Sequence, residues 1–219
     1  MKKGDFIWGG IILAMAAMLI IEPSRDAFIE FTSNYKLFGG FIKFGVLSTM
    51  GELLALRMTK GDWKFPSYLF VRAFIWGILG VVITLMFTIF DAGVTKALEA
   101  NLLPGGSSVF AFAFFTSAIM NLTFAPTFMF AHKISDTYLD LKGEGVKDIN
   151  VSKIVDRIDL KAFLSFVIGK TVPLFWIPAH TITFLLPGEY RVIFAASLSI
   201  ALGVLLAIGK GKPQPQLQK

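Results

Sequence analysis

The chain contains no cysteine, and this absence excludes disulfide bonds, thiol catalysis and thiolate metal sites. Histidine is almost as scarce, since His132 and His180 are too few for an ordinary zinc site unless carboxylates contribute. Charged residues make up only 16% of the chain, whereas soluble domains carry about 25%. Because 55% of the residues are hydrophobic and the mean hydropathy is +0.68, the composition predicts a membrane protein.

Signatures of catalysis are also missing. The sequence shows no paired acids, Ser-His-Asp order or metal triad in a suitable context, and the lone Gly143-Glu144-Gly145 follows no predicted strand. We therefore expect no enzymatic activity, no cofactor and no metal site. The net charge of +6 would suggest nucleic acid in a soluble protein. The positions of the basic residues fit a membrane orientation better, so we expect no nucleic-acid partner.

Six apolar segments follow one another, at about residues 6–21, 37–56, 66–90 and 109–131, and as a hairpin between 162 and 208. A span needs about 20 apolar residues, so the first segment is slightly short. The two lysines before it also resemble the start of a signal peptide. Because Glu22-Pro23-Ser24-Arg25 is a poor cleavage context, a retained first helix is favoured.

The segments together predict an all-α, polytopic bundle of six transmembrane helices. At 219 residues the chain allows one domain, at most two, and we place a single domain at residues 1–209. The polar residues 210–219 would form a disordered tail. The lipid bilayer is the expected partner, and the sequence leaves open whether the protein is a homo-oligomer.

One long polar stretch, residues 132–161, separates the fourth segment from the hairpin and would form a cytoplasmic loop. Four of its apolar residues share one helical face, which predicts an amphipathic helix on the membrane surface. These residues are Val151, Ile154, Val155 and Ile158.

Basic residues are distributed unevenly between the two sides that six spans define. The side with both termini would hold fourteen Lys and Arg residues: Lys2, Lys3, Arg57, Lys60, Lys64, Lys133, Lys142, Lys147, Lys153, Arg157, Lys161, Lys210, Lys212 and Lys219. The other side would hold four: Arg25, Lys36, Lys96 and Arg191. Because cytoplasmic loops are enriched in Lys and Arg, both termini are predicted to be cytoplasmic.

The first half of the final hairpin is unusual because it contains two prolines, Pro173 and Pro178. Each removes a backbone donor and frees the carbonyl four residues earlier, at Gly169 and Leu174. Such carbonyls are tolerated in hydrocarbon only where protein or water satisfies them, so we expect a broken helix that faces the protein interior. This helix either is a kinked structural element or lines a pathway.

The second half of the hairpin carries small residues at every fourth position. Such a ridge lets a neighbouring helix approach closely, which is how membrane helices pack. The ridge consists of Ala195, Ser199, Gly203 and Ala207.

Charged residues inside the spans are candidate functional residues, because a charge at the bilayer centre costs at least about 2.5 kcal/mol. Glu52 and Arg72 would lie at one depth near the cytoplasmic side and could form an ion pair, although Lys170 could compete for Glu52. Lys43 and His180 would lie nearer the opposite side, where Lys43 could snorkel and His180 could bond a freed carbonyl. Alternatively, Lys43, Arg72 and Lys170 line a positive lumen for anionic solutes.

Other polar, glycine and proline residues occur in an informative order. They are Gly51-Glu52, Arg72, Gly77, Gly80, Asp91, the polar Asn121 of the fourth span with Pro126, Trp176, Pro178, His180, Thr183-Phe184, Leu186-Pro187 and Arg191. Over about residues 45–209 they resemble the motifs of the Mpv-seventeen and peroxisomal-membrane-protein family. Where that family has a glutamine and an asparagine, the chain has His180 and Thr183. The first apolar segment and residues 132–161 stand outside the pattern.

The resemblance implies an all-helical integral membrane protein with a channel-like role and no catalysis, because family members are discussed as weakly selective channels. We therefore expect a channel or facilitator for small solutes. A non-transporting structural or assembly protein is the alternative. An intramembrane enzyme using Glu52 and His180 is disfavoured, since the two would lie at opposite depths. We expect a bacterial cytoplasmic membrane or, alternatively, a mitochondrial inner or peroxisomal membrane.

The charge distribution predicts an orientation that can be measured. Tags at both termini are expected to be accessible only from the cytoplasmic side, and a tag beside Lys96 only from the other side, because basic loops stay cytoplasmic. Protease protection of tagged protein in sealed vesicles measures both. Termini on opposite sides would contradict the six-span arrangement.

Overall fold

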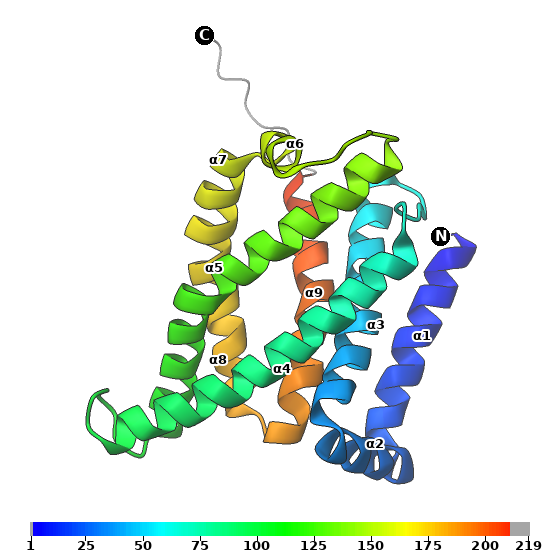
Figure 1. Ribbon diagram of the computed structural model, residues 1–219. Coiled ribbons are helices and arrows are strands. Elements are labelled where there is room, and N and C mark those ends of the chain that lie inside the picture. Colours follow the sequence, from blue (N-terminus) through cyan, green and yellow to red (C-terminus); the bar gives the residue numbers. More distant parts are fainter. Residues whose placement is uncertain (1, 211–219) are drawn as a thin grey trace. The chain divides into compact units, whose positions relative to one another are not determined.

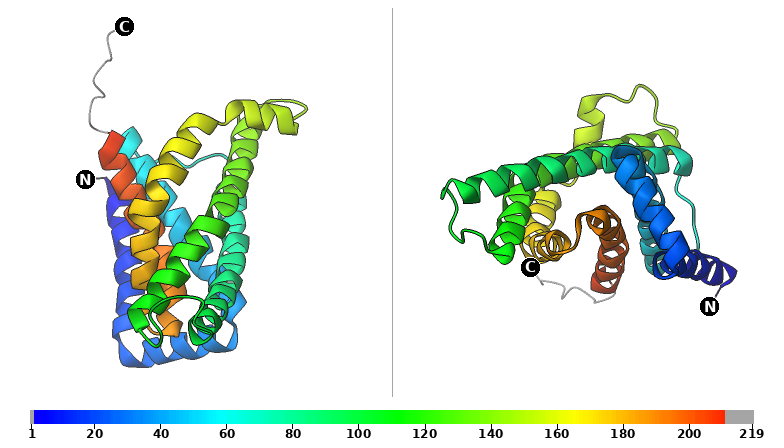
Figure 2. Two further views of the ribbon diagram at one scale, coloured as in Figure 1. Left: turned by 90° about the vertical axis from the view of Figure 1, so that its left-hand side faces the viewer. Right: turned by 90° about the horizontal axis from the view of Figure 1, so that it is seen from below.

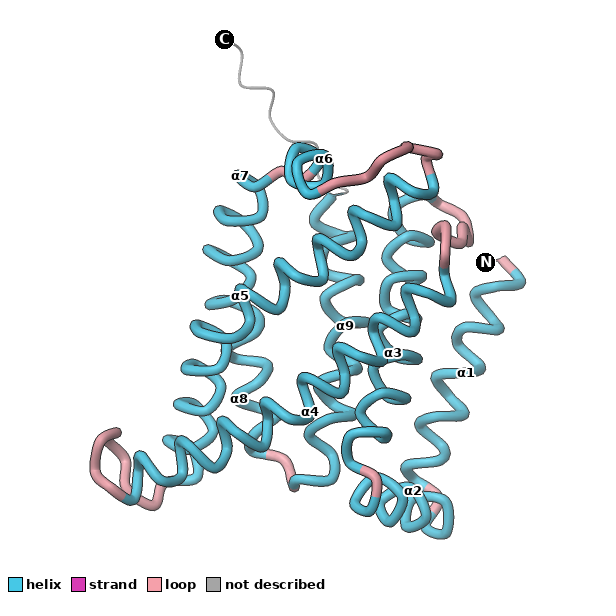
Figure 3. Tube along the Cα trace, in the orientation of Figure 1, coloured by secondary structure: helices cyan, strands magenta, loops and turns pink. Residues whose placement is uncertain are grey.

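The computed structural model describes residues 2–210, with side chains for residues 2–205. Every regular element in this range is a helix and none is a strand (Figure 3), which confirms the all-α prediction. The predicted disordered tail lies outside the described residues, apart from Lys210 at the end of the last helix. The side chain of Ala207, the last member of the small-residue ridge, also lies outside the described range.

The helices follow one another through short connections (Figure 1). In order they are α1 (Lys3–Ile20), α2 (Glu22–Asn34), α3 (Lys36–Lys60), α4 (Leu69–Glu99), α5 (Val109–Gly143), α6 (Val151–Arg157), α7 (Leu160–Ala162), the π-helix η1 (Phe163–Trp176), α8 (Ile177–Leu185) and α9 (Gly188–Lys210).

Six helical stretches of the described chain are long and apolar enough to cross a membrane. They are Lys3–Ile20, Lys36–Lys60, Leu69–Glu99, Val109–Gly143, Leu160–Leu185 and Gly188–Leu205. They match the six predicted segments in order and confirm that prediction. Their length and composition suggest an integral membrane protein.

Two helices differ in extent from their predicted spans. α5 continues past Ala131 to Gly143, so the stretch predicted to be a loop begins as helix. Leu139 and Leu141 are buried there, so packing extends the helix beyond the apolar segment. α4 begins at Leu69 rather than at Pro66, because the intervening residue 68 adopts a left-handed conformation with φ 61°. The predicted amphipathic helix is present as α6.

The described chain forms two compact units. The first contains residues 2–65, 73–84 and 192–210, and the second contains residues 66–72 and 85–191. α4 and α9 therefore contribute to both units.

In the first unit, α2 is a helix that hydropathy did not predict, because its sequence is polar. Figure 2 shows it lying across the ends of α1 and α3. α1 has no buried residue and is fixed by polar contacts. Asp5 of α1 accepts hydrogen bonds from Nε and Nη2 of Arg57 at 2.9 and 3.0 Å, and Nε1 of Trp8 donates to the carbonyl of Met50 at 3.1 Å.

The small-residue ridge of α9 meets α3 at Gly51. A Cβ atom at Gly203 would lie 2.9 Å from the carbonyl oxygen of Gly51, and one at Gly51 would lie 2.9 Å from the carbonyl oxygen of Ser199. The Ser199 hydroxyl is 3.4 Å from the carbonyl oxygen of Leu47, to which it donates. The two backbones approach so closely that any larger side chain would push them apart.

In the second unit, the expected break at the two prolines takes a different form. The helix continues without interruption, but it is a π-helix up to Trp176 and an α-helix from Ile177. A π-helix bonds each N–H to the carbonyl five residues earlier, so Pro173 leaves the carbonyl of Ile168, rather than that of Gly169, without its usual donor. Pro178 lies in the first turn of α8, directly after the change from π- to α-helical bonding.

The close approach at Gly51 gives a stability prediction. Gly203→Leu is expected to lower the unfolding temperature in detergent, because overpacking costs about 1–3 kcal/mol. The matched control is Gly93→Leu in α4, since a Cβ there meets no atom within 4 Å. Thermal unfolding followed by circular dichroism measures both variants, and equal losses would show that the ridge is not a tight interface.

Candidate functional site

A seam of polar side chains runs between α5 and α8 in the second unit. Asn121 of α5 is fully buried, and its Nδ2 and Oδ1 lie 3.0 and 3.2 Å from Nδ1 of His180 on α8. The amide can donate to this ring nitrogen or accept from it, according to the histidine tautomer. Nδ2 of Asn121 also donates to the carbonyl oxygen of Ser117 at 2.9 Å.

Hydroxyl groups extend the seam on both helices. Ser117 is fully buried and donates to the carbonyl oxygen of Ile177, 2.7 Å away at the start of α8. Thr116 and Thr183 are also fully buried, and each donates to a carbonyl of its own helix at 2.7 and 2.9 Å. These bonds satisfy polar groups that would otherwise be costly among apolar helices.

Trp176 and His180 place two ring nitrogens at the edge of this seam. The rings stack with centroids 5.2 Å apart and an interplanar angle of 28°. Nε1 of Trp176 is buried and has no hydrogen-bond partner within residues 2–205. Nε2 of His180 has none in the same range either, because its contacts there are Asn121 through Nδ1 and the rings of Trp176 and Phe87. The seam thus ends in two polar ring atoms that could bind a small polar molecule.

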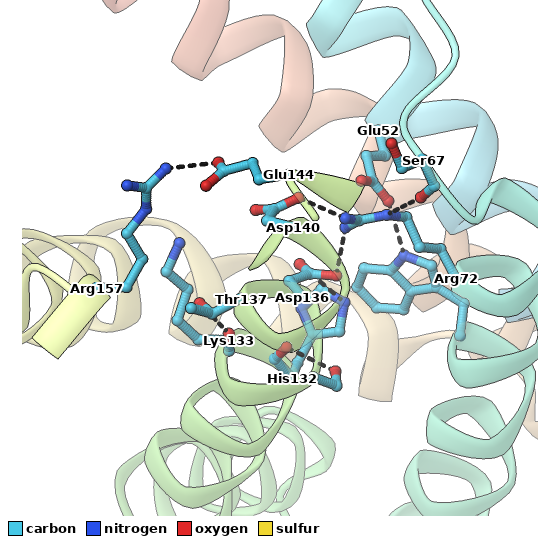
Figure 4. Close-up of polar contacts among 12 residues, drawn as sticks. Glu52, Ser67, Arg72, His132, Lys133, Asp136, Thr137, Asp140, Glu144 and Arg157 are labelled. Carbon is cyan, nitrogen blue, oxygen red and sulfur yellow. Dashed lines mark hydrogen bonds and ion pairs between the residues drawn. The ribbon is translucent and has the colours of Figure 1, made fainter. Parts of the chain in front are cut away.

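A second cluster in the same unit surrounds the guanidinium of Arg72 (Figure 4). Arg72 is 4% exposed and forms ion pairs with Asp136 at 2.9 Å and Asp140 at 2.5 Å, both on α5. Its Nε donates to the carbonyl oxygen of Ser67 at 3.1 Å, and Nε2 of His132 lies 3.5 Å from the Asp136 carboxylate. Two carboxylates thus compensate one buried guanidinium.

The sequence reasoning missed both aspartates because they follow the apolar segment. A signal for them was present, since His132, Asp136 and Asp140 are spaced by four residues and share one helical face. A buried arginine needs acidic partners, and this face offers two. The predicted pairing of Glu52 with Arg72 stays a prediction. In the first unit, Oε2 of Glu52 accepts from Nε1 of Trp76 at 3.3 Å.

The two remaining lysines of the predicted set have opposite surroundings. Lys43 is 6% exposed on α3, with its ammonium 4.8 Å from the ring centroid of Phe28 on α2. Lys170 is exposed on η1. A lumen lined by Lys43, Arg72 and Lys170 would require Lys170 to be buried, whereas the structure shows it exposed.

The residues of the proline-rich signature mostly position helices. Pro126 lies inside α5, which continues through it, and Pro187 lies in the turn between α8 and α9. Arg191 forms an ion pair with Asp91 at 2.5 Å and donates to the carbonyl of Leu186 at 2.9 Å. Its guanidinium also lies over the rings of two phenylalanines, Phe112 and Phe184. These contacts tie the turn to the end of α4.

Within the described residues, no group of three or more His, Cys, Asp and Glu side chains could hold a metal ion. Comparisons with protein-family models, with curated proteins and with solved structures found no match to this chain. The resemblance to the Mpv-seventeen family thus stays a hypothesis carried by the motifs alone.

The Arg72 cluster gives a prediction for mutagenesis. Asp136→Asn is expected to lower the unfolding temperature more than Asp140→Asn, because the side chain of Asp136 is 22% exposed and that of Asp140 is 55% exposed. Arg72→Met with Asp136→Asn should cost less than the sum of the single losses, by about 0.5–3 kcal/mol.

Thermal unfolding in detergent of the parent, Arg72→Met, Asp136→Asn and the double variant measures this coupling. Asp156→Asn on α6, which removes an exposed carboxylate, is the matched control. Additive losses, or equal effects of the two asparagine variants, would contradict the assignment of Asp136 as the main partner.

Proposed function

We propose that this protein is a channel or facilitator for small polar solutes. The observation that carries the proposal is the pair of stacked rings at the end of the α5–α8 seam. The buried N–H of Trp176 has no acceptor within residues 2–205, and Nε2 of His180 lies on the adjacent ring. Buried polar groups are almost always hydrogen-bonded, and the need is strongest in hydrocarbon. A passing polar solute or water would supply the missing partner.

The chemistry of the seam supports weak selectivity. Its groups are an amide, an imidazole, an indole and hydroxyls, all of which bond neutral polar molecules. Arg72 is compensated by two carboxylates, so it adds no net positive charge that would attract anions. We therefore propose small neutral solutes as the first class to test.

We further propose that both termini lie on the cytoplasmic side, as the distribution of Lys and Arg predicts. A bacterial cytoplasmic membrane is the first choice, and a mitochondrial inner or peroxisomal membrane is the alternative.

A non-transporting structural or assembly role is the second candidate. It is favoured by the hydrogen bonds of Asn121 and Ser117, which join α5 to α8 and would fix packing without any solute. In that case the seam stabilises the protein and conducts nothing.

Flux through purified, reconstituted protein distinguishes the two roles. Proteoliposomes are loaded with neutral solutes of graded size, and entry is followed by light scattering. We expect Trp176→Phe to reduce flux several-fold, because an aromatic six-membered ring is kept while the N–H is lost together with the five-membered ring of the indole. The lost ring volume should lower the unfolding temperature only modestly. Asn121→Leu is expected to reduce both flux and stability. The matched control is Thr123→Val, because Thr123 is exposed on the opposite side of α5 and bonds only its own helix.

Three results decide between the roles. Flux that depends on Trp176 with intact folding supports the channel. A parent protein that passes no solute faster than empty liposomes, together with a stability loss in Asn121→Leu, supports the structural role. Flux unaffected by Trp176→Phe and Asn121→Leu would remove the seam as the path.

A further inference from the structure

Lys43 is a buried cation whose surroundings in the first unit do not compensate its charge. It lies two turns into α3, about 10 Å along the helix from its start. The residue is 6% exposed, and its ammonium lies over the ring of Phe28 at 4.8 Å. Within residues 2–205 it has neither a hydrogen-bond acceptor nor a carboxylate partner.

Close packing of α2 on α3 places Phe28 over this lysine. Thr32, one turn after Phe28, is buried, and its Cγ2 lies 3.4 Å from where a Cβ of Gly39 would be. Gly39 lies one turn before Lys43, and Thr32 lies one turn after Phe28, so two contacts one turn apart hold α2 against α3. Gly39 allows α2 to approach α3. Phe28, one turn before Thr32 on α2, then lies over the ammonium of Lys43.

The carboxylates of the first unit are engaged elsewhere or exposed. On α2, Glu22 and Asp26 lie 3.5 and 3.1 Å from the guanidinium of Arg25, and Glu30 is exposed.

The remaining acids are bound away from α2. Asp5 pairs with Arg57, Asp62 pairs with Lys2, and Glu52 accepts from a tryptophan. The first-unit segments of α4 and α9 contribute no acidic residue.

A phenyl ring is an incomplete partner for a buried ammonium. The ammonium has three N–H donors, and a ring face engages it from one side only. A buried charge is stable when it is paired and hydrogen-bonded, and a phosphate oxygen gives a stronger, charge-assisted bond. Lys36, exposed at the start of α3, lies seven residues before Lys43 and therefore on the same side of the helix.

We propose that Lys43 and Lys36 bind the phosphate group of an anionic phospholipid at the junction of α2 and α3, where the ring of Phe28 turns aside to admit it. The position favours a lipid. α1 and α3 are apolar enough to span a membrane, and α2 is a polar helix lying across their ends (Figure 2). Headgroup phosphates occupy this level of a bilayer, and the flexible lysine stem can reach them.

Binding to the full chain, purified in a neutral detergent, tests the proposal. Phosphatidylglycerol is titrated while thermal unfolding is recorded, with phosphatidylcholine and inorganic phosphate as the comparison ligands. We expect phosphatidylglycerol to raise the unfolding temperature saturably and phosphatidylcholine not to. Lys43→Met is expected to weaken the apparent affinity about tenfold or more, since it removes a charge-assisted bond. Lys43→Arg should retain the response.

The matched control is Lys170→Met, which removes an exposed lysine from another candidate span and should leave the affinity unchanged. Phe28→Leu removes the ring over Lys43 and is expected to tighten phosphatidylglycerol binding several-fold. Because Phe28→Leu keeps Lys43, it tests the proposed lipid site even if the Lys43→Met variant does not fold.

The outcomes separate lipid from free anion. A response to phosphatidylglycerol but not to inorganic phosphate, lost in Lys43→Met, supports the lipid site. Equal responses to both would identify a general phosphate site and overturn the lipid assignment. No response, a response retained in Lys43→Met, or unchanged affinity in Phe28→Leu would overturn the site. Because the readout is binding, the result is independent of solute flux.

Discussion

The arrangement of this protein depends on one constraint, which is that polar groups on apolar helices must find partners inside the protein. Hydrocarbon offers none, so a buried amide, hydroxyl or charge bonds either its own helix or the helix that packs against it. In the second unit, Asn121 and Ser117 bond α8, and Arg72 bonds the end of α5. These contacts act at both ends of α5 and fix its register against two neighbours. Trp176 and Lys43 lack such partners within residues 2–205, and these are the two places where we propose an external ligand.

The first unit meets the same constraint mainly by bringing backbones together. Gly51 and Gly203 let α3 and α9 approach until a Cβ at either position would lie 2.9 Å from a carbonyl oxygen of the other helix. The Thr84 hydroxyl donates to the carbonyl of Gly80 at 2.8 Å, one turn earlier on its own helix. Small residues and self-bonded hydroxyls are the usual means by which membrane helices pack without a hydrophobic driving force. Lys43, Ser48 and Thr49 of α3 depart from this pattern, since within residues 2–205 the lysine has no acceptor and the two buried hydroxyls have no hydrogen-bond partner.

Hydropathy and spacing were enough to predict the spans, because both are local properties of the chain. The six apolar segments and the four-residue spacing that leads from Ser199 to Gly203 could be read directly. The partners of Arg72 could not be reached this way, since Asp136 and Asp140 lie beyond the apolar segment and join the span only because packing prolongs α5. α2 was missed for the opposite reason. It is polar, so its stability depends on contacts with α1 and α3 that a local pattern does not contain.

The separation of neutral and charged groups bears on what the protein could conduct. The seam that ends at His180 has no fixed charge, whereas two arginines of the same unit are held in ion pairs, Arg72 with two aspartates and Arg191 with Asp91. An arginine in such a pair holds helices in place, and admitting an anion would require separating the arginine from its carboxylates. A neutral seam has no such cost, because a solute hydroxyl or water can exchange bonds with an imidazole or an indole one at a time. If the protein conducts as we propose, the seam would pass neutral polar molecules in preference to anions, and the paired arginines would belong to the scaffold that keeps the seam in register.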